Sequence, residues 1–222
     1  MRAINLEKLL PEDIPPGERI LWHGRPQWMS LFRRAYRADF VAGYFALLAA
    51  WNVFDAAVEA GAVPAATAGA RTLAIGLAAL GLLALLAWAS ARTALFVVTS
   101  RRVVMKIGVA LQIFYNLPFS QIQAAALRLE DGGAGDVTLT LCPGARIGYL
   151  HLWPFARPLR YAQPEPTLRG LADASHVSEI LVGALVAAAA ERGETFTAAP
   201  GGAGLVSAGA DARLPDGNAV AA

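Results

Sequence analysis

The sequence predicts a membrane α-helical hairpin of two transmembrane helices, joined to a small antiparallel β domain that ends in a C-terminal helix. Two apolar segments, residues 40–58 and 72–91, are each long enough to cross a bilayer as a helix. From residue 93 to about residue 152, short β-prone runs alternate with turns, as in a small barrel or sandwich. Helical periodicity then extends from Asp173 to Arg192.

The composition excludes several other classes of protein. Of the 222 residues, 56% are hydrophobic and the mean hydropathy is +0.44, which is too apolar for an ordinary soluble domain. The single Cys142 excludes an internal disulfide and a multi-cysteine metal site. The three histidines, His23, His151 and His176, have no ligand-like spacing, so no metal is expected. The net charge of only +2 gives no indication of nucleic-acid binding.

The first segments of the chain are assigned from charge and helix breakers. Residues 1–39 are expected to be a proline-broken cytoplasmic segment without the layout of a signal peptide, in which residues 18–24 are a strand or an edge. The first span, residues 40–58, measures about 28 Å as a helix, and the second, residues 72–91, about 30 Å. Residues 59–71 are expected to form a short periplasmic loop.

Basic residues predict the orientation of this hairpin. They precede the first span and follow the second, whereas the loop holds only one, beside Glu59. The positive-inside rule therefore places both termini in the cytoplasm, in a multi-pass protein of the bacterial inner (intracytoplasmic) membrane. The flanking basic residues are Arg33, Arg34, Arg37, Arg92, Arg101, Arg102 and Lys106.

The β domain is expected over residues 92–192. Clean alternation predicts a strand in VTLTL, and the run RIGYLHLW is expected to be another strand that includes His151. The C-terminal helix has Asp173 or Ser175 as its N-cap and Gly193 as its stop signal. Residues 193–222 are rich in Gly, Ala and Pro and are expected to be a disordered tail.

Several short motifs resemble known families. The stretch FVVTSRRVVMKIGVALQIFYNLPFSQI resembles the bacterial pleckstrin-homology-like (PH-like) domain that follows paired membrane helices, with Thr99, Arg102, Gly108, Pro118 and Ile122 at the matching positions. The lead-in PPGERILWHGRPQW, the hairpin, NLPFSQI, YLHLWPFARPLR and PEPTLR together resemble the PuhB-type photosynthetic complex assembly proteins of purple bacteria. This resemblance covers most of residues 15–190.

The resemblance implies a non-enzymatic assembly factor for the photosynthetic reaction centre and core light-harvesting complex, with no cofactor. Its partners would be subunits of those complexes. The alternative is a general membrane-anchored PH-like module that senses lipid or membrane stress. An enzyme is not expected, because the sequence arranges no catalytic constellation.

The strongest candidate contact residues are the basic side chains Arg101, Arg102 and Lys106, at or near the turn between two predicted strands. They form either a solvated hairpin or a contact for anionic lipid headgroups or an acidic partner surface. A second candidate is the aromatic and basic segment with Trp153, Phe155, Arg157 and Arg160. This segment is either a binding edge or a linker packed on the domain.

Polar and small residues in the spans are further candidates. Asn52 and Asp55 are polar groups near the outer end of the first span, and they lie either at the interface or against another transmembrane helix. The second span is rich in Ala and Gly. It would pack on the first span, on a client helix or on a second copy in a homodimer.

Overall fold

A computed structural model describes residues 15, 17–130, 132–142, 148–158, 163–193, 196–198 and 204–207. The chain divides into two compact units. The helical unit is Gln27–Arg92, and the β unit combines Met1–Pro26 with Thr93–Ala222. The segment before Gln27 therefore belongs to the same unit as the strands that follow Arg92.

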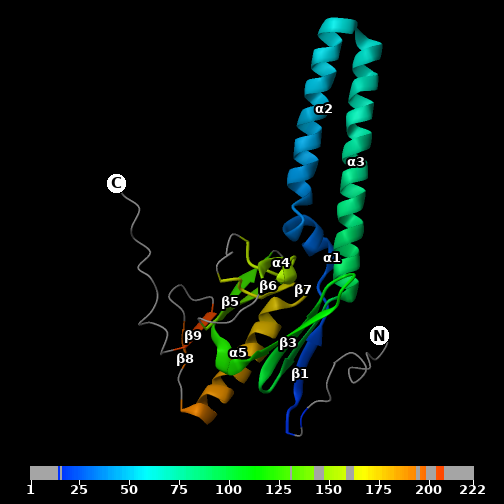
Figure 1. The fold of residues 1–222 in the computed structure, drawn as a ribbon. Helices are drawn as coiled ribbons and strands as arrows, with labels where there is room; N and C mark the ends of the chain where they lie inside the picture. Colours follow the sequence, from blue (N-terminus) through cyan, green and yellow to red (C-terminus); the bar gives the residue numbers. More distant parts are fainter. Residues whose placement is uncertain are drawn as a thin grey trace. The chain divides into compact units, whose positions relative to one another are not determined.

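Two long antiparallel helices dominate the helical unit and lie side by side (Figure 1). The short helical turns α1 and η2 precede them, and Arg37, in the left-handed conformation with φ of 55°, separates η2 from the first long helix. By length and composition α2, α3 and a later helix, α5, could each cross a membrane. The bounds are α1 Trp28–Ser30, η2 Leu31–Ala35, α2 Ala38–Ala60, α3 Ala62–Thr93 and α5 Ala174–Arg192.

The predicted loop over residues 59–71 is wrong. Only Gly61, with φ of 91°, interrupts the helices, and α3 begins at Ala62. The segment is rich in alanine, a strong helix former. Its one proline, Pro64, lies in the first turn of α3, where a backbone N–H has no helical partner to lose.

The first sheet of the β unit has the order β1-β2-β3-β4, with every neighbouring pair antiparallel. The edge strand expected in residues 18–24 is confirmed as β1, and Pro118 ends β4 at the opposite edge, where a missing N–H is tolerated. One face of β2 and β3 carries the fully buried Phe96 and Met105. The strands are β1 Ile20–Gly24, β2 Leu95–Thr99, β3 Arg102–Ile107 and β4 Ile113–Pro118.

The second sheet has the order β7-β6-β5-β9-β8. A 3-10 turn, η3 Phe119–Gln121, leads into it from β4. The register pairs Arg128 with Asp136 across β5 and β6, and Thr138 with Thr167 across β6 and β7. The strands are β5 Ile122–Leu129, β6 Gly135–Leu141, β7 Thr167–Leu171, β8 Phe196–Ala198 and β9 Gly204–Ser207.

Strands β8 and β9 correct the prediction that residues 193–222 are disordered. They form an antiparallel pair, and β9 adds to β5 at Ala124, Ala125 and Ala126. The edge of β5 offers free main-chain partners, and these outweigh a composition that disfavours order. The other predicted tail residues lie outside the described part of the chain, except Gly193.

His151 lies in a helical turn, α4 Tyr149–Leu152, and not in the predicted strand. Apolar alternation over only four residues fits a single helical turn as well as a strand. Arg146 and Ile147, the first two residues of the predicted RIGYLHLW strand, lie outside the described residues.

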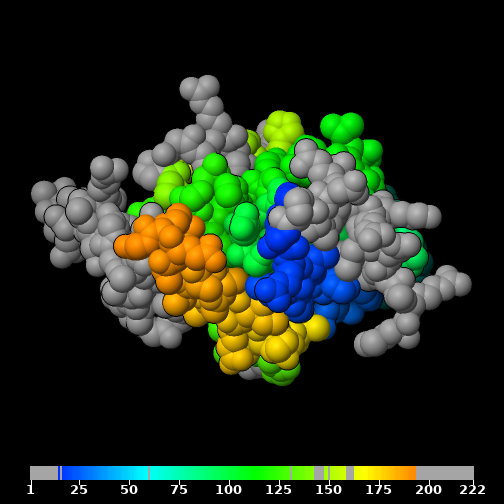
Figure 2. Space-filling view, turned by 90° about the horizontal axis from the view of Figure 1, so that it is seen from below, coloured from blue at the N-terminus to red at the C-terminus, as the bar shows by residue number. Residues whose placement is uncertain are grey.

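Helix α5 closes the β unit. The Asp173 carboxylate accepts a hydrogen bond from the His176 N–H at 3.1 Å, and Gly193 ends the helix in the left-handed conformation, so both predicted ends are confirmed. Its buried face includes Val177, Leu181 and Leu185. The helix contacts β1 of the first sheet and β5 and β6 of the second, and Figure 2 shows it beside the segment that holds β1.

Candidate functional site

The turn between β2 and β3 is held by Thr99. Its hydroxyl accepts hydrogen bonds from the backbone N–H groups of Arg101 and Arg102, at 3.2 and 3.0 Å, and donates to the Arg102 carbonyl at 2.9 Å. The Ser100 hydroxyl accepts a bond from the Arg19 N–H at 3.2 Å, which ties the turn to the chain entering β1. The sequence therefore builds a rigid basic turn from local hydroxyl bonds.

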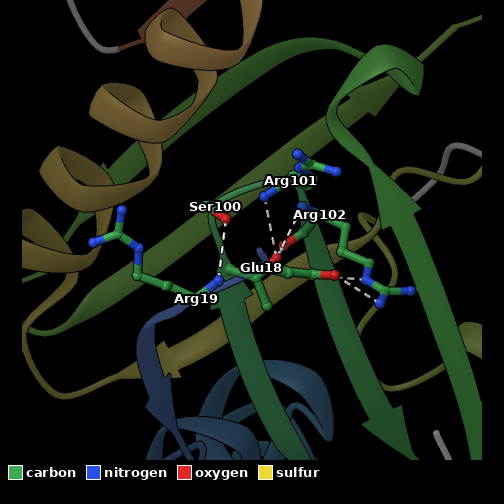
Figure 3. A network of polar contacts seen from close by, with 6 residues as sticks. Glu18, Arg19, Ser100, Arg101 and Arg102 are labelled. Atoms are coloured by element: carbon green, nitrogen blue, oxygen red, sulfur yellow. Dashed lines mark hydrogen bonds and ion pairs between the residues drawn. The ribbon is translucent and has the colours of Figure 1, made fainter. Parts of the chain in front are cut away.

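Arg102 is paired with Glu18, a residue 84 positions earlier in the chain (Figure 3). Its Nε and Nη2 atoms each donate to one carboxylate oxygen at 2.8 Å, which is a bidentate pair. The Glu18 side chain is only 4% exposed and that of Arg102 is 20% exposed. The prediction that Arg102 contacts a membrane or partner is therefore corrected, because its guanidinium is engaged inside the β unit.

The pKa of the Glu18 carboxyl is lowered, which favours its ionised form. Burial by itself raises its pKa, but the hydrogen-bonded Arg102 guanidinium and the nearby Arg101 charge help to lower the pKa below the ordinary value of 4.5. Sequence reasoning missed this partner. The available signal was the absence of acidic residues from Ala60 to Leu129, which forces any counter-ion of Arg102 to come from elsewhere in the chain.

Of the three predicted basic contacts on the β2–β3 hairpin, Arg101 and Lys106 stay accessible. Arg101 is exposed at the tip of the turn, and its side chain has no hydrogen bond or ion pair among the described residues. Lys106 lies opposite Phe114 in the sheet, with its ammonium nitrogen 5.4 Å from the ring centroid. Lys106 pairs with Leu95 near the far end of the β2–β3 hairpin, so the structure does not place it next to Arg101 at the turn. The two cations are here called together the basic turn, and each can attract anionic groups.

The aromatic and basic segment after α4 divides between core and surface. Phe155 is 1% exposed and meets Phe96 edge-to-face at 5.4 Å between ring centroids, so its predicted contact role is corrected to a core role. Trp153 is 46% exposed, and the half-exposed Arg157 pairs with Glu165 at 2.8 Å. Arg160 lies outside the described residues.

The two polar residues of the first span have different surroundings. The Asn52 amide donates to the Thr72 hydroxyl at 3.0 Å, and that hydroxyl donates to the Ala68 carbonyl. Asn52 therefore joins α2 to α3 inside the hairpin. Asp55 is exposed on α2, five residues before its end, and has no hydrogen bond or ion pair within the described residues.

Three weaker candidates, His23, His151 and Cys142, do not form a binding cluster among the described residues. His23 is exposed on β1 and His151 is exposed on α4. Across the described residues no three ligating side chains gather to hold a metal ion. Cys142 is a partly exposed free thiol.

Two sheets closed by a C-terminal helix define a PH-like domain, here carried with a helical hairpin. Residues 45–181, more than half of the chain, match the family described as Bacterial PH domain. The chain belongs to this family.

A more particular likeness comes from one curated relative. The uncharacterized 23.7 kDa protein in puhA 5' region of Rhodobacter capsulatus is 36% identical over 174 residues, which cover 78% of this chain and 81% of that protein. This relative confirms the resemblance drawn from the sequence motifs. No solved structure matches the chain.

Proposed function

We propose that this chain is a non-enzymatic assembly factor for the photosynthetic reaction centre and core light-harvesting complex. The observation that carries the proposal is the 36% identity to a protein in the puhA 5' region, shared over most of both chains. The motifs that resemble PuhB-type proteins add to it, because YLHLWPFARP exceeds what a general PH-like domain requires. The protein would hold client subunits at the membrane without turnover.

The proposed topology has two spans, α2 and α3, in the inner membrane. Helix α5 is apolar enough to be a third candidate, but its Val177, Leu181 and Leu185 face is buried, and it contacts strands of both sheets. The closing role of α5 in the β unit argues against a third span. The basic residues that precede α2 and follow α3 in the sequence then favour cytoplasmic termini.

Client contacts are proposed for each unit separately. In the helical unit, α2 exposes an apolar stripe at helical spacing, and such a face can pack against a client transmembrane helix. In the β unit, the basic turn and the exposed Trp153 would meet cytoplasmic parts of clients or anionic lipid headgroups. The stripe consists of Phe40, Tyr44, Leu47, Trp51, Phe54 and Val58.

The test is near-infrared absorption of membranes from a strain that lacks this protein. The deletion strain should lose the core-antenna and reaction-centre bands and keep peripheral-antenna bands, and the wild-type gene should restore them. A double variant, Arg101→Glu with Lys106→Glu, should restore them only partly, because it reverses the charge of the basic turn. Arg102 stays unchanged in that variant, since its substitution would break the Glu18 pair.

Unchanged bands in the deletion strain would contradict the assembly role. The alternative module that senses lipid or membrane stress would then be the one to test, through survival of the deletion strain under membrane stress. Full restoration by the double variant, with normal protein levels, would instead remove the basic turn from the proposed client contact.

A further inference from the structure

A second polar site lies on the β5–β6–β7 sheet, away from the basic turn in the fold. A cavity of about 220 Å³ opens there. Its charged lining residues are Arg128 of β5, Asp136 of β6, Arg169 of β7 and Arg157 from the segment before β7. The hydroxyls of Thr138 and Thr167 also line it, 3.3 Å apart.

The strand register places these groups on one face of the sheet. Arg128 is directly opposite Asp136, and Thr138 is directly opposite Thr167, so each pair points to the same side. The neighbouring positions Val137, Leu139 and Leu168 point to the other face, where they are fully buried. The polar face therefore follows from the alternation of side chains along β5, β6 and β7.

The carboxylates around the cavity already have partners. Asp136 accepts a hydrogen bond from the Gly170 N–H at 2.8 Å and lies 3.9 Å from the Arg169 Nε atom. Glu165, 5% exposed, accepts from Arg157 at 2.8 Å. Arg128 is exposed, and no ion pair or hydrogen bond of its guanidinium occurs among the described residues.

Charge and stability both point to a ligand. Among the described residues around the cavity, three guanidinium groups meet two carboxylates, and Arg128 is the one without a carboxylate partner there. Asp136 and Arg169 are each only 7% exposed. Buried ion pairs contribute little net stability compared with apolar packing, so stability alone does not account for this cluster.

We propose that this cavity binds a phosphate monoester group. Guanidinium forks match the oxygens of phosphate in geometry and charge. The negative phosphate would pair with the positive charge of Arg128. Arg157 is held in place by Glu165, and Arg169 by Asp136 and the Ala156 carbonyl. The group can come from a soluble phosphate ester or from a lipid headgroup. The inference does not depend on the assembly role.

Titration calorimetry on the full-length protein in detergent micelles tests the site. Glycerol 3-phosphate is the soluble probe, and dihexanoyl phosphatidic acid is the lipid probe, with dihexanoyl phosphatidylcholine as its matched control. Arg128→Gln should weaken binding about tenfold or more, because it removes charge-assisted hydrogen bonds. Its thermal stability should match that of the wild type, because the Arg128 side chain is exposed and unpaired among the described residues.

Arg19→Gln is the control variant, since Arg19 is also exposed but lies at β1. Arg128-dependent binding of glycerol 3-phosphate would support a soluble ester, and Arg128-dependent binding of phosphatidic acid alone would support a headgroup. The proposal would be overturned by no saturable binding of either probe. It would equally be overturned by the same loss of binding in Arg19→Gln and Arg128→Gln.

Discussion

At the scale of single residues, the Glu18–Arg102 pair decides which cations of the basic turn remain available. A buried carboxylate is costly unless it is paired and hydrogen-bonded, and Glu18 satisfies both conditions through Arg102. The pair also fixes β1 against the β2–β3 turn. Arg102 therefore serves the fold, and Arg101 beside it remains the exposed cation.

Replacing the acid should destabilise the β unit measurably. Glu18→Gln is expected to lower the free energy of unfolding by about 1.5–3 kcal/mol at pH 7, because it leaves the Arg102 charge without its counter-ion. Thermal unfolding followed by circular dichroism would measure this in detergent micelles. Arg101→Gln is the matched control, and it should change stability by less than about 0.5 kcal/mol, because Arg101 is exposed.

The pH dependence of that loss follows from the lowered pKa of Glu18. A carboxyl whose pKa is lower in the folded state stabilises the fold above its unfolded-state value, here 4.5, and loses that effect as pH falls through the folded-state value. The stability gap between wild type and Glu18→Gln should therefore be largest near neutral pH and close below pH 4.5. A gap that is constant from pH 7 to pH 3 would contradict the pairing.

At the scale of elements, the α2–α3 hairpin is built on close approach at small residues. A Cβ added at Gly76 would lie 2.8 Å from the Phe45 Cβ atom, whereas one at Gly81 would meet nothing within 4 Å. At the base of the hairpin, the Tyr36 and Ser90 hydroxyls are 2.8 Å apart and hydrogen-bonded. The glycines and alanines of the second span therefore divide into packing positions and open positions.

Two valine variants separate these positions. Gly76→Val should destabilise the hairpin by about 1–3 kcal/mol, since Phe45 must move to admit the new side chain. Gly81→Val should change stability little, because the same side chain enters open space. Unfolding of each variant in detergent, monitored by the helical circular dichroism signal, gives the comparison. Equal effects at both positions would show that helix propensity, and not packing, controls the result.

At the scale of the whole molecule, the main question is how many helices cross the membrane. Helix α3 has 32 residues and is about 48 Å long, which exceeds a hydrocarbon core of about 30 Å. The hairpin turns at the single residue Gly61, so this long helix must project beyond the core on one or both sides. Only the two-span topology leaves α5 packed on the strands that it contacts.

A reporter experiment tests this topology. A cysteine placed at Gly61 should react with a membrane-impermeant maleimide in intact cells, because the tip of the hairpin should face the periplasm. A cysteine at Glu191, on the exposed side near the end of α5, should react only after the cells are broken. Cys142 is replaced by serine in both variants. Labelling of residue 191 in intact cells would contradict the proposed topology and favour a third span.

The sequence determined the features that depend on local composition and periodicity. Two apolar segments predicted the long apolar helices α2 and α3. Asp173 and Gly193 correctly marked the ends of α5, because capping depends on neighbouring residues. Two β-prone runs on either side of a polar turn predicted the strands around Thr99–Arg102. The family resemblance also followed from short motifs such as YLHLWPFARP, and the family match and the relative confirm it.

Only the tertiary structure decided the features that join distant parts of the chain. Glu18 pairs with Arg102, 84 positions away in the sequence, and Phe155 packs in the core against Phe96. Strand β9 pairs with the edge of β5. The polar cavity likewise needs three strands in register before Arg128 and Arg169 share one face. Pairing and burial between remote residues depend on how the strands are laid side by side, and no local pattern encodes that arrangement.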